Sequence, residues 1–136
     1  MVIHIKETTS TNHYLQELLK NEPLDEGSVI VADTQTAGRG QGNNYWESGF
    51  GENLLFSMLL YPDFNEINYQ FIISKMVSVG VAETLADIGN DVTIKRPKDI
   101  YAGNKKITGI LIENSLSGKN INHSIIGIGI NVNQEV

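Results

Sequence analysis

The sequence predicts an α+β domain with a largely antiparallel mixed sheet and its helices on one face. β-branched and apolar runs suited to strands recur along the chain, and two stretches carry apolar residues at helical spacing. Segments rich in Gly and Asn separate these runs. With 136 residues, 40% hydrophobic and 19% charged, the chain has the size and composition of one globular domain.

The first part of the chain predicts two strands around one helix. Residues 2–6 are short and β-branched, which favours a strand. Ser10-Thr11 then offers an N-cap for a helix with leucines at helical spacing, which ends near Pro23. Residues 28–32 are typical of a buried strand. Residues 34–51 are rich in Gly and Asn and predict a long loop.

The second part predicts four strands and a second helix. Residues 53–61 are apolar enough for a central strand, whereas residues 69–88 have the length and spacing of a buried helix. Three strands are expected to follow. We expect the last two to pair as a hairpin through the turn-forming residues 117–120, and the three strands to cover residues 92–95, 107–113 and 123–132.

Charge and composition exclude several function classes. The net charge of -6 provides no overall positive field that would attract nucleic acid or an anionic membrane. Zero cysteines exclude a thiolate zinc site and a cysteine nucleophile, and fit a reducing cytoplasm. The N-terminus lacks the apolar stretch of a signal peptide, and no apolar run approaches the roughly 20 residues of a membrane span. We therefore expect a soluble, cytoplasmic protein.

A glycine-rich loop with one arginine, residues 35–42, is the first candidate for a binding site. Such a loop lets backbone N–H groups approach an anion, and Arg39 could grip a carboxylate or phosphate with two hydrogen bonds. No Gly-Lys-Ser/Thr follows, so it is not a Walker loop, and the strand after it argues against a Rossmann motif. A flexible hairpin connection remains the alternative.

A basic cluster is the second candidate, because five cations between Lys95 and Lys106 stand close to one acid in an otherwise acidic chain. A solvated turn would explain such a cluster equally well. Lys106 differs from its neighbours, since it directly precedes an apolar strand. From a strand mouth its ammonium group could project into a pocket and neutralise a transferring phosphoryl group.

Alternating glycines within the last strand, Gly127 and Gly129, form the third candidate. Such glycines often mark close approach of a ligand or of another backbone, and tight packing between strands is the alternative. Asn131 could then simply cap the strand end, and Trp46 could be either a core anchor or a stacking platform. The three histidines show no metal-ligand spacing, and no Gly-x-Ser-x-Gly elbow indicates a serine hydrolase.

Together, these segments resemble the biotin protein ligase family over nearly the whole chain. Order and spacing make the resemblance specific. The fold implied is related to that of class II aminoacyl-tRNA synthetases. The matching motifs, in chain order, are Ser10-Thr11-Asn12, residues 35–40, Trp46, residues 95–99, residues 105–113 and residues 127–131.

The resemblance implies the site residues. Arg39 and Lys106 would be the catalytic cations. The biotin-binding residues would be Ser10, Thr11, Gln35, Gly38, Arg39, Gly40, Lys106 and Gly109. The ATP-binding residues would be Gln41, Asn44, Trp46, Lys98, Asp99 and Asn131, with Asp99 also close to Mg²⁺.

The implied activity is ligation of biotin to a protein. Biotin would react with ATP and Mg²⁺ to give biotinyl-5'-AMP, and a lysine of a biotin carboxyl carrier protein would then displace AMP. Cations and N–H groups would hold the two anions in line, so no protein nucleophile is required. Neither nucleic acid nor membrane is an expected partner.

The sequence departs from the family at two motifs. Lys95-Arg96-Pro97-Lys98-Asp99 stands where the family usually has Lys-Trp-Pro-Asn-Asp, so Lys98 replaces an amide near the expected metal region. The arginine-rich continuation of the glycine loop is here Gln41-Gly42-Asn43-Asn44, with less positive charge. Two alternatives therefore stay open: an impaired or non-catalytic fragment that binds biotin or the adenylate, and a related ligase for lipoate or another acid.

Family members also continue beyond the strand that ends near Asn133, through a segment that closes over the adenylate and a small SH3-like domain. We expect residues 1–136 to form one domain, the N-terminal major part of the catalytic domain. The DNA-binding domain of some bacterial members and the SH3-like domain are not expected. Exposed strand edges where that segment packs would favour a homodimer.

Overall fold

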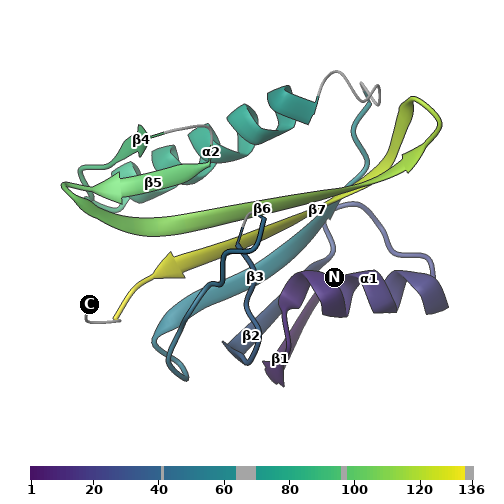
Figure 1. The fold of residues 1–136 in the computed structure, drawn as a ribbon, viewed down its shortest axis with the longest axis horizontal. Helices are drawn as coiled ribbons and strands as arrows, with labels where there is room; N and C mark the ends of the chain where they lie inside the picture. The colour runs from purple at the N-terminus through teal and green to yellow at the C-terminus, as the bar shows by residue number, and fades with distance from the viewer. Residues whose placement is uncertain (41, 64–69, 96–97, 134–136) are drawn as a thin grey trace.

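The structure, a computed structural model, describes residues 1–40, 42–63, 70–95 and 98–133 (Figure 1). Within these ranges the chain forms a sheet and two helices. Their order is β1 (Val2–Thr8), α1 (Thr11–Asn21), β2 (Val29–Gln35), β3 (Asn53–Leu60), α2 (Gln70–Asp87), β4 (Thr93–Lys95), β5 (Asp99–Ala102), β6 (Lys105–Ser117) and β7 (Asn120–Asn131).

The strands form one seven-stranded sheet in the order β1-β2-β3-β7-β6-β5-β4. β1 and β2 are parallel, and every other neighbouring pair is antiparallel. Parallel neighbours need a crossover connection, which α1 provides. The predicted α+β class and the largely antiparallel mixed sheet are confirmed.

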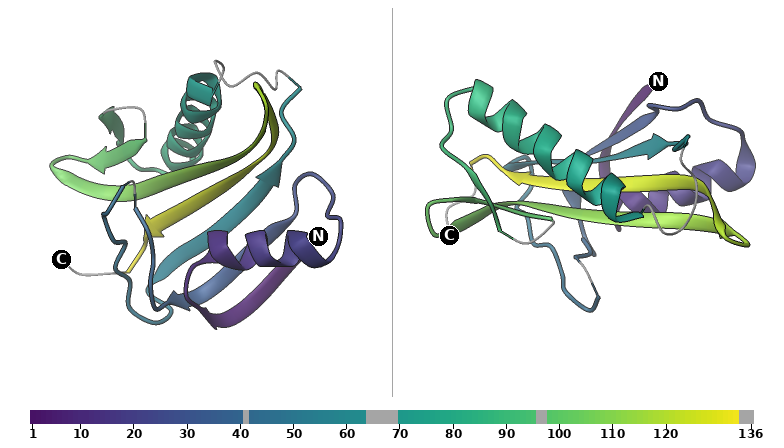
Figure 2. Two further views of the ribbon diagram at one scale, coloured as in Figure 1. Left: turned by 45° about the vertical axis from the view of Figure 1, so that its right-hand side comes forward. Right: turned by 90° about the horizontal axis from the view of Figure 1, so that it is seen from above.

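The expected placement of the helices differs from the structure. Along β7, Ile125 packs in the cluster under α1, whereas its neighbours Ile126 and Ile128 pack in the cluster under α2. Leu59 and Leu60 of β3 divide in the same way. Because successive strand residues point to opposite faces, the helices lie on opposite faces and not on one. Figure 2 shows the strands running between them.

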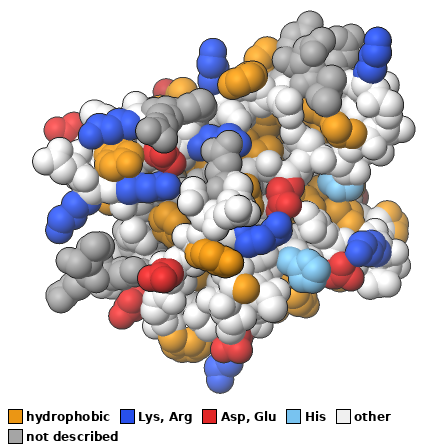
Figure 3. Space-filling model, viewed as in Figure 1, with side chains coloured by type: hydrophobic (Ala, Val, Ile, Leu, Met, Phe, Trp, Pro, Cys, Tyr) orange, Lys and Arg blue, Asp and Glu red, His pale blue; other side chains and the backbone are white. Residues whose placement is uncertain are grey.

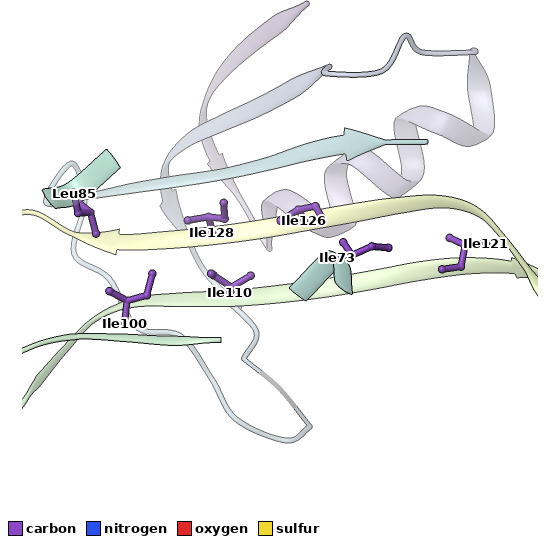
Figure 4. Close-up of a cluster of buried hydrophobic side chains, with 7 residues drawn as sticks. All are labelled: Ile73, Leu85, Ile100, Ile110, Ile121, Ile126 and Ile128. Atoms are coloured by element: carbon purple, nitrogen blue, oxygen red, sulfur yellow. The ribbon is translucent and has the colours of Figure 1, made fainter. Parts of the chain in front are cut away.

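The cluster under α2 is built almost entirely of isoleucine (Figure 4). It joins Ile73 and Leu85 of α2 to isoleucines of three strands, which are Ile100, Ile110, Ile121, Ile126 and Ile128. The cluster under α1 joins Leu15 of α1 to Ile30, Leu59 and Ile125. The central strands are therefore packed on both sides.

The structure contains one strand, β5, that the sequence pattern did not predict. β5 is only four residues long and turns into β6 through Gly103, whose φ of 61° is the left-handed conformation that glycine adopts at low cost. β6 is longer than expected, and its hairpin with β7 turns at Gly118, as predicted. Among the described residues, no helix is long and apolar enough to cross a lipid bilayer.

Candidate functional site

A cleft of about 510 Å³ lies where the loop between β2 and β3 folds over β6 and β7. The loop crosses the sheet on the face that also carries α1 (Figure 1). Past Gly109, β6 has no paired strand on its outer edge among the described residues, and the cleft continues around that edge to the first turns of α2. Chain segments far apart in sequence therefore meet at one hollow.

Trp46 lies directly on the sheet at the centre of this cleft. A Cβ atom on Gly109 would lie 2.7 Å from Cζ3 of the indole, and one on Gly129 would lie 2.6 Å from Nε1. The Trp46 backbone N–H donates to the Gly38 carbonyl at 2.8 Å, which ties the loop to the ring's position. Close approach does occur at both alternating glycines, but the groups that approach are side chains and not a backbone: Trp46 at Gly129 and Asn12 at Gly127.

Polar side chains at the start of α1 form one wall of the cleft. The side-chain oxygen of Gln35 accepts from the Thr11 N–H at 2.8 Å and from the Thr11 hydroxyl at 3.2 Å. Ser57 of β3 bonds to Thr11 and to Asn12, and all three of these groups are buried. Ser10 is the N-cap of α1, since its hydroxyl accepts from the His13 N–H at 3.1 Å.

Arg39 stands at the mouth of the cleft and is held by Glu113 of β6. Its Nη2 and Nη1 donate to the two carboxylate oxygens at 2.7 and 3.2 Å. The loop folds back on itself here: the backbones of Arg39 and Tyr45 form an isolated antiparallel β-bridge, and the Gly40 N–H donates to the Asn44 carbonyl. The backbone of the glycine loop and one carboxylate therefore orient this guanidinium group together.

Lys106 lies at the start of β6, with its ammonium group over the Trp46 ring. Its ammonium nitrogen lies 3.0 Å from a carboxylate oxygen of Asp99 and 5.8 Å from the centre of the indole. The second distance is within range of a cation–π interaction. The Asn131 side chain donates to the Lys106 carbonyl at 3.3 Å. Arg39 and Lys106 are consequently each paired with a carboxylate, and both remain partly exposed.

The structure brings most of the predicted site residues together. Those that line the cleft are Ser10, Thr11, Gln35, Arg39, Gly40, Asn44, Trp46, Lys98, Asp99, Lys106 and Gly109. Gly38 lies beneath the Trp46 backbone, where a Cβ atom would collide with the Trp46 carbonyl. Asn131 lies at the strand end beside Lys106. Gln41 falls outside the described residues.

Three residues of the site, Asn12, Ser57 and Glu113, were not among the predicted binding residues. Asn12 and Glu113 stood in the matching motifs without an assigned role. Ser57 could have been found from the sequence, because a serine inside the apolar run of β3 is expected to be buried and therefore to have a hydrogen-bond partner. No sequence pattern could pair Asn12 with Glu113, which lie 101 positions apart.

Charges on the visible face are mixed in sign, with basic and acidic side chains interspersed around apolar ones (Figure 3). In the described part of the chain, no group of three His, Cys, Asp or Glu side chains could hold a metal ion. The cleft is thus suited to an anionic ligand with an aromatic or apolar part, held by paired cations, an indole and buried amides.

Comparison with known proteins identifies the family. The model of the Biotin/lipoate A/B protein ligase family matches residues 4–131. The chain belongs to this family. The bifunctional ligase/repressor BirA of Bacillus spizizenii is 38% identical over 129 residues, which is 93% of this chain.

Solved structures of biotin protein ligases share the fold. The enzyme from Aquifex aeolicus in complex with biotin and ATP matches 99% of this chain with a TM-score of 0.70 and 36% identity. The enzyme from Leishmania major in complex with biotinyl-5-AMP matches 99% with a TM-score of 0.74 and 28% identity. The matches span 39% of the Bacillus protein and 53% and 58% of the two structures.

Proposed function

We propose that this chain provides the biotin-activating site of a biotin protein ligase, which joins biotin to ATP and passes it to a lysine of a carrier protein. One observation carries the proposal: in a member of this family, a single cleft brings the glycine loop with Arg39, the start of α1, Trp46 and Lys106 together. The two structural relatives were solved with biotin and ATP, and with biotinyl-5-AMP.

Biotin would bind on the α1 side of the cleft. Thr11 and Gln35 would meet its polar ring, and Ser10, Gly38, Gly40 and Gly109 would shape the space around it. Arg39 and Lys106 would face its carboxylate and the α-phosphate of ATP. A guanidinium and an ammonium group in a partly buried cleft offset the repulsion between these two anions better than they would in water.

The nucleotide would bind on the Trp46 side. Trp46 Nε1 and Asn131 Oδ1 are buried and have no hydrogen-bond partner among the described residues. Together they offer one donor and one acceptor, the combination that an adenine edge needs. Asn44, Lys98 and Gln41 would contact the rest of ATP, with Lys98 adding a positive charge near the phosphates.

Mg²⁺ would enter with the phosphates. Asp99 is the one carboxylate among the described residues that line the cleft. Mg²⁺ in nucleotide sites usually takes one or two carboxylates together with phosphate oxygens. The residues thus fit an ion carried mainly by ATP, with Asp99 as its protein ligand, and such an ion would neutralise phosphate charge.

The first reaction needs no protein nucleophile. A carboxylate oxygen of biotin attacks the α-phosphorus, the bond to the β-phosphate oxygen breaks, and biotinyl-5'-AMP and pyrophosphate form. Arg39 and Lys106 hold the reacting groups in line and stabilise the charge on the α-phosphate. In the second reaction, a carrier lysine amine attacks the biotinyl carbonyl, AMP leaves, and the amine loses a proton as the amide forms.

Two measurements test the proposal. The purified 136-residue protein is titrated calorimetrically with biotin, alone and with Mg·ATP, and its biotin-dependent exchange between ATP and pyrophosphate is measured. Binding that tightens with ATP, together with exchange, is expected. Lys106→Ala should lower exchange by about 10²- to 10³-fold, as for loss of one group that stabilises transition-state charge. Lys119→Ala, in the distant β6–β7 turn, is the matched control.

The outcomes separate the alternatives. Biotin binding that ATP does not change, without exchange, would mean a binding module and not a ligase. If lipoate supports the exchange reaction in place of biotin, the substrate is lipoate, the other acid named in the family description. A folded sample that binds neither acid would refute the proposal.

A further inference from the structure

We propose that Glu113 is a positioning residue of this site: its carboxylate fixes Arg39 at the mouth of the cleft, so that the guanidinium group meets the biotin carboxylate already oriented. This inference rests on the proposed function. The inference concerns how Glu113 holds Arg39 in place, and how buried hydrogen bonds in turn hold Glu113.

The Arg39–Glu113 pair has the geometry of a strong contact. Two separate guanidinium nitrogens donate to the two carboxylate oxygens, at 2.7 and 3.2 Å. Such bidentate pairs fix direction as well as distance. Arginine carries five N–H donors, so this pair leaves three for a ligand. A bound carboxylate could therefore engage Arg39 while Glu113 still holds it.

Glu113 is itself anchored from behind. Its Oε1, the same atom that accepts from Arg39 Nη2, also accepts from the Asn12 side-chain amide at 2.9 Å. Asn12 is 4% exposed, and Gly127 lies beneath it, where a Cβ atom would collide with the amide oxygen. The carboxylate is thus clamped between a buried amide and the arginine, which distinguishes it from a surface ion pair of little energetic value.

The anchoring continues into the core of the domain. Asn12 Oδ1 accepts from Ser57, which lies 2.7 Å from the Thr11 hydroxyl. The Thr11 N–H and hydroxyl donate to Gln35, the Ser57 hydroxyl donates to Asn12 Oδ1, and the Asn12 amide donates to Glu113. Each hydroxyl donates once, so the set is complete. The network links Arg39 to α1, β2, β3 and β6.

This arrangement lowers the cost of binding. A free arginine side chain loses rotamer freedom when it grips a ligand, whereas a side chain already held loses less. Glu113 also partly neutralises Arg39, so a ligand bound there must interact with the remaining donors and not with an isolated charge. Removal of Glu113 should therefore weaken biotin binding even though it removes a negative charge from the cleft mouth.

The test compares biotin binding by the wild-type protein and Glu113→Gln. We expect the dissociation constant and the KM for biotin in the exchange reaction to rise about tenfold, the cost of one charge-assisted hydrogen bond. The KM for ATP should change less than the KM for biotin, because the proposed nucleotide contacts of Trp46, Asn131 and Lys98 are not made through Arg39 or Glu113. Glu17→Gln, which removes a similar glutamate from an exposed pair with Lys20, is the matched control.

A double-mutant cycle makes the test specific. In an Arg39→Ala background, Glu113→Gln should have no further effect on biotin affinity, since the group it positions is absent. Circular dichroism checks the fold of each variant. Glu113→Asp keeps the charge with a shorter reach; it should bind biotin with an affinity between wild type and Glu113→Gln, and it serves if Glu113→Gln does not fold.

Three results would overturn the inference. If Glu113→Gln binds biotin with wild-type affinity, the positioning role is refuted while the proposed function stands. If Glu113→Gln causes the same tenfold loss of affinity in the wild-type and Arg39→Ala backgrounds, Glu113 acts independently of Arg39 and the positioning role is refuted as well. A wild-type protein that binds no biotin would remove the proposed function together with this inference.

Discussion

Trp46 is the residue on which the geometry of the cleft depends. Its ring occupies space that opens only because Gly109 and Gly129 have no side chains, and its backbone ties down Gly38. The same glycines that weaken β6 and β7 as strands therefore leave the space in which the indole ring packs. At this scale, a single added methyl group is enough to disturb the site.

Gly129→Ala is predicted to destabilise the domain and to weaken nucleotide binding. The new methyl group would lie 2.6 Å from Trp46 Nε1, so the ring must move, at a cost of about 1–3 kcal/mol as for other overpacked sites. Urea unfolding measures this cost. Gly80→Ala is the control, because the new methyl group has open space in α2 and should stabilise by about 0.5–1 kcal/mol. Equal stability of both variants would contradict the role of Trp46.

His123 is predicted to make stability depend on pH. Burial lowers its pKa below the usual value of 6.5, so the unfolded chain binds the proton more readily than the folded one. This contribution to stability is complete above pH 6.5 and is lost as pH falls through the folded pKa. The unfolding free energies of wild type and His123→Gln, measured from pH 8 to pH 5, should differ in slope only below about pH 6.5. Parallel profiles would contradict the prediction.

At the scale of elements, α1 matters through its first turn. Ser10, Thr11 and Asn12 begin the helix, are each at most 4% exposed and contribute to the wall of the cleft. The helix is short and packs on β2, β3 and β7 mainly through Leu15. Its N-terminal geometry therefore fixes the position of the polar groups that the site uses.

Ser10→Ala is predicted to loosen this turn. The serine hydroxyl caps the helix by accepting from the His13 N–H, and loss of such a cap typically costs about 1 kcal/mol. Denaturant unfolding measures the loss. Ser10→Thr keeps a capping hydroxyl and should cost clearly less. A Ser10→Ala protein as stable as wild type would show that tertiary packing alone holds the first turn.

At the scale of the whole molecule, the central strands are packed on both faces, with α1 and the cleft on one side and α2 on the other. Ligand and core therefore share strands β6 and β7. Anything that binds the cleft of the folded chain, and not the unfolded chain, adds its binding free energy to the stability of the domain.

Biotin is predicted to raise the stability of the domain by mass action. At 100 times its dissociation constant, the unfolding free energy should rise by about 2.7 kcal/mol. Thermal unfolding with increasing biotin measures this effect. The methyl ester of biotin, which lacks the carboxylate charge that Arg39 and Lys106 would meet, should stabilise less. Equal effects of acid and ester would place the carboxylate away from these cations.

The sequence by itself determined the local elements and the candidate residues. Hydrophobic periodicity, the Ser10 cap and the turn at residues 117–120 are local signals. They predicted six strands and both helices, close to the observed bounds except for β6, which is longer. The ordered motifs indicated Thr11, Gln35, Arg39, Trp46 and Lys106 before any contact was known. β5 was not predicted, because its residues Asp99–Ala102 lie within the basic cluster, which is equally typical of a solvated turn.

The tertiary structure alone decided which faces the helices cover and which groups pair. Consecutive apolar residues such as Ile125 and Ile126 show that a strand is buried on both sides, but not which helix lies on which side. The Asn12–Glu113 and Arg39–Glu113 contacts join residues 101 and 74 positions apart. Such partners depend on sheet order and on the path of a loop, which are set by the packing of the whole chain and not by any local stretch of it.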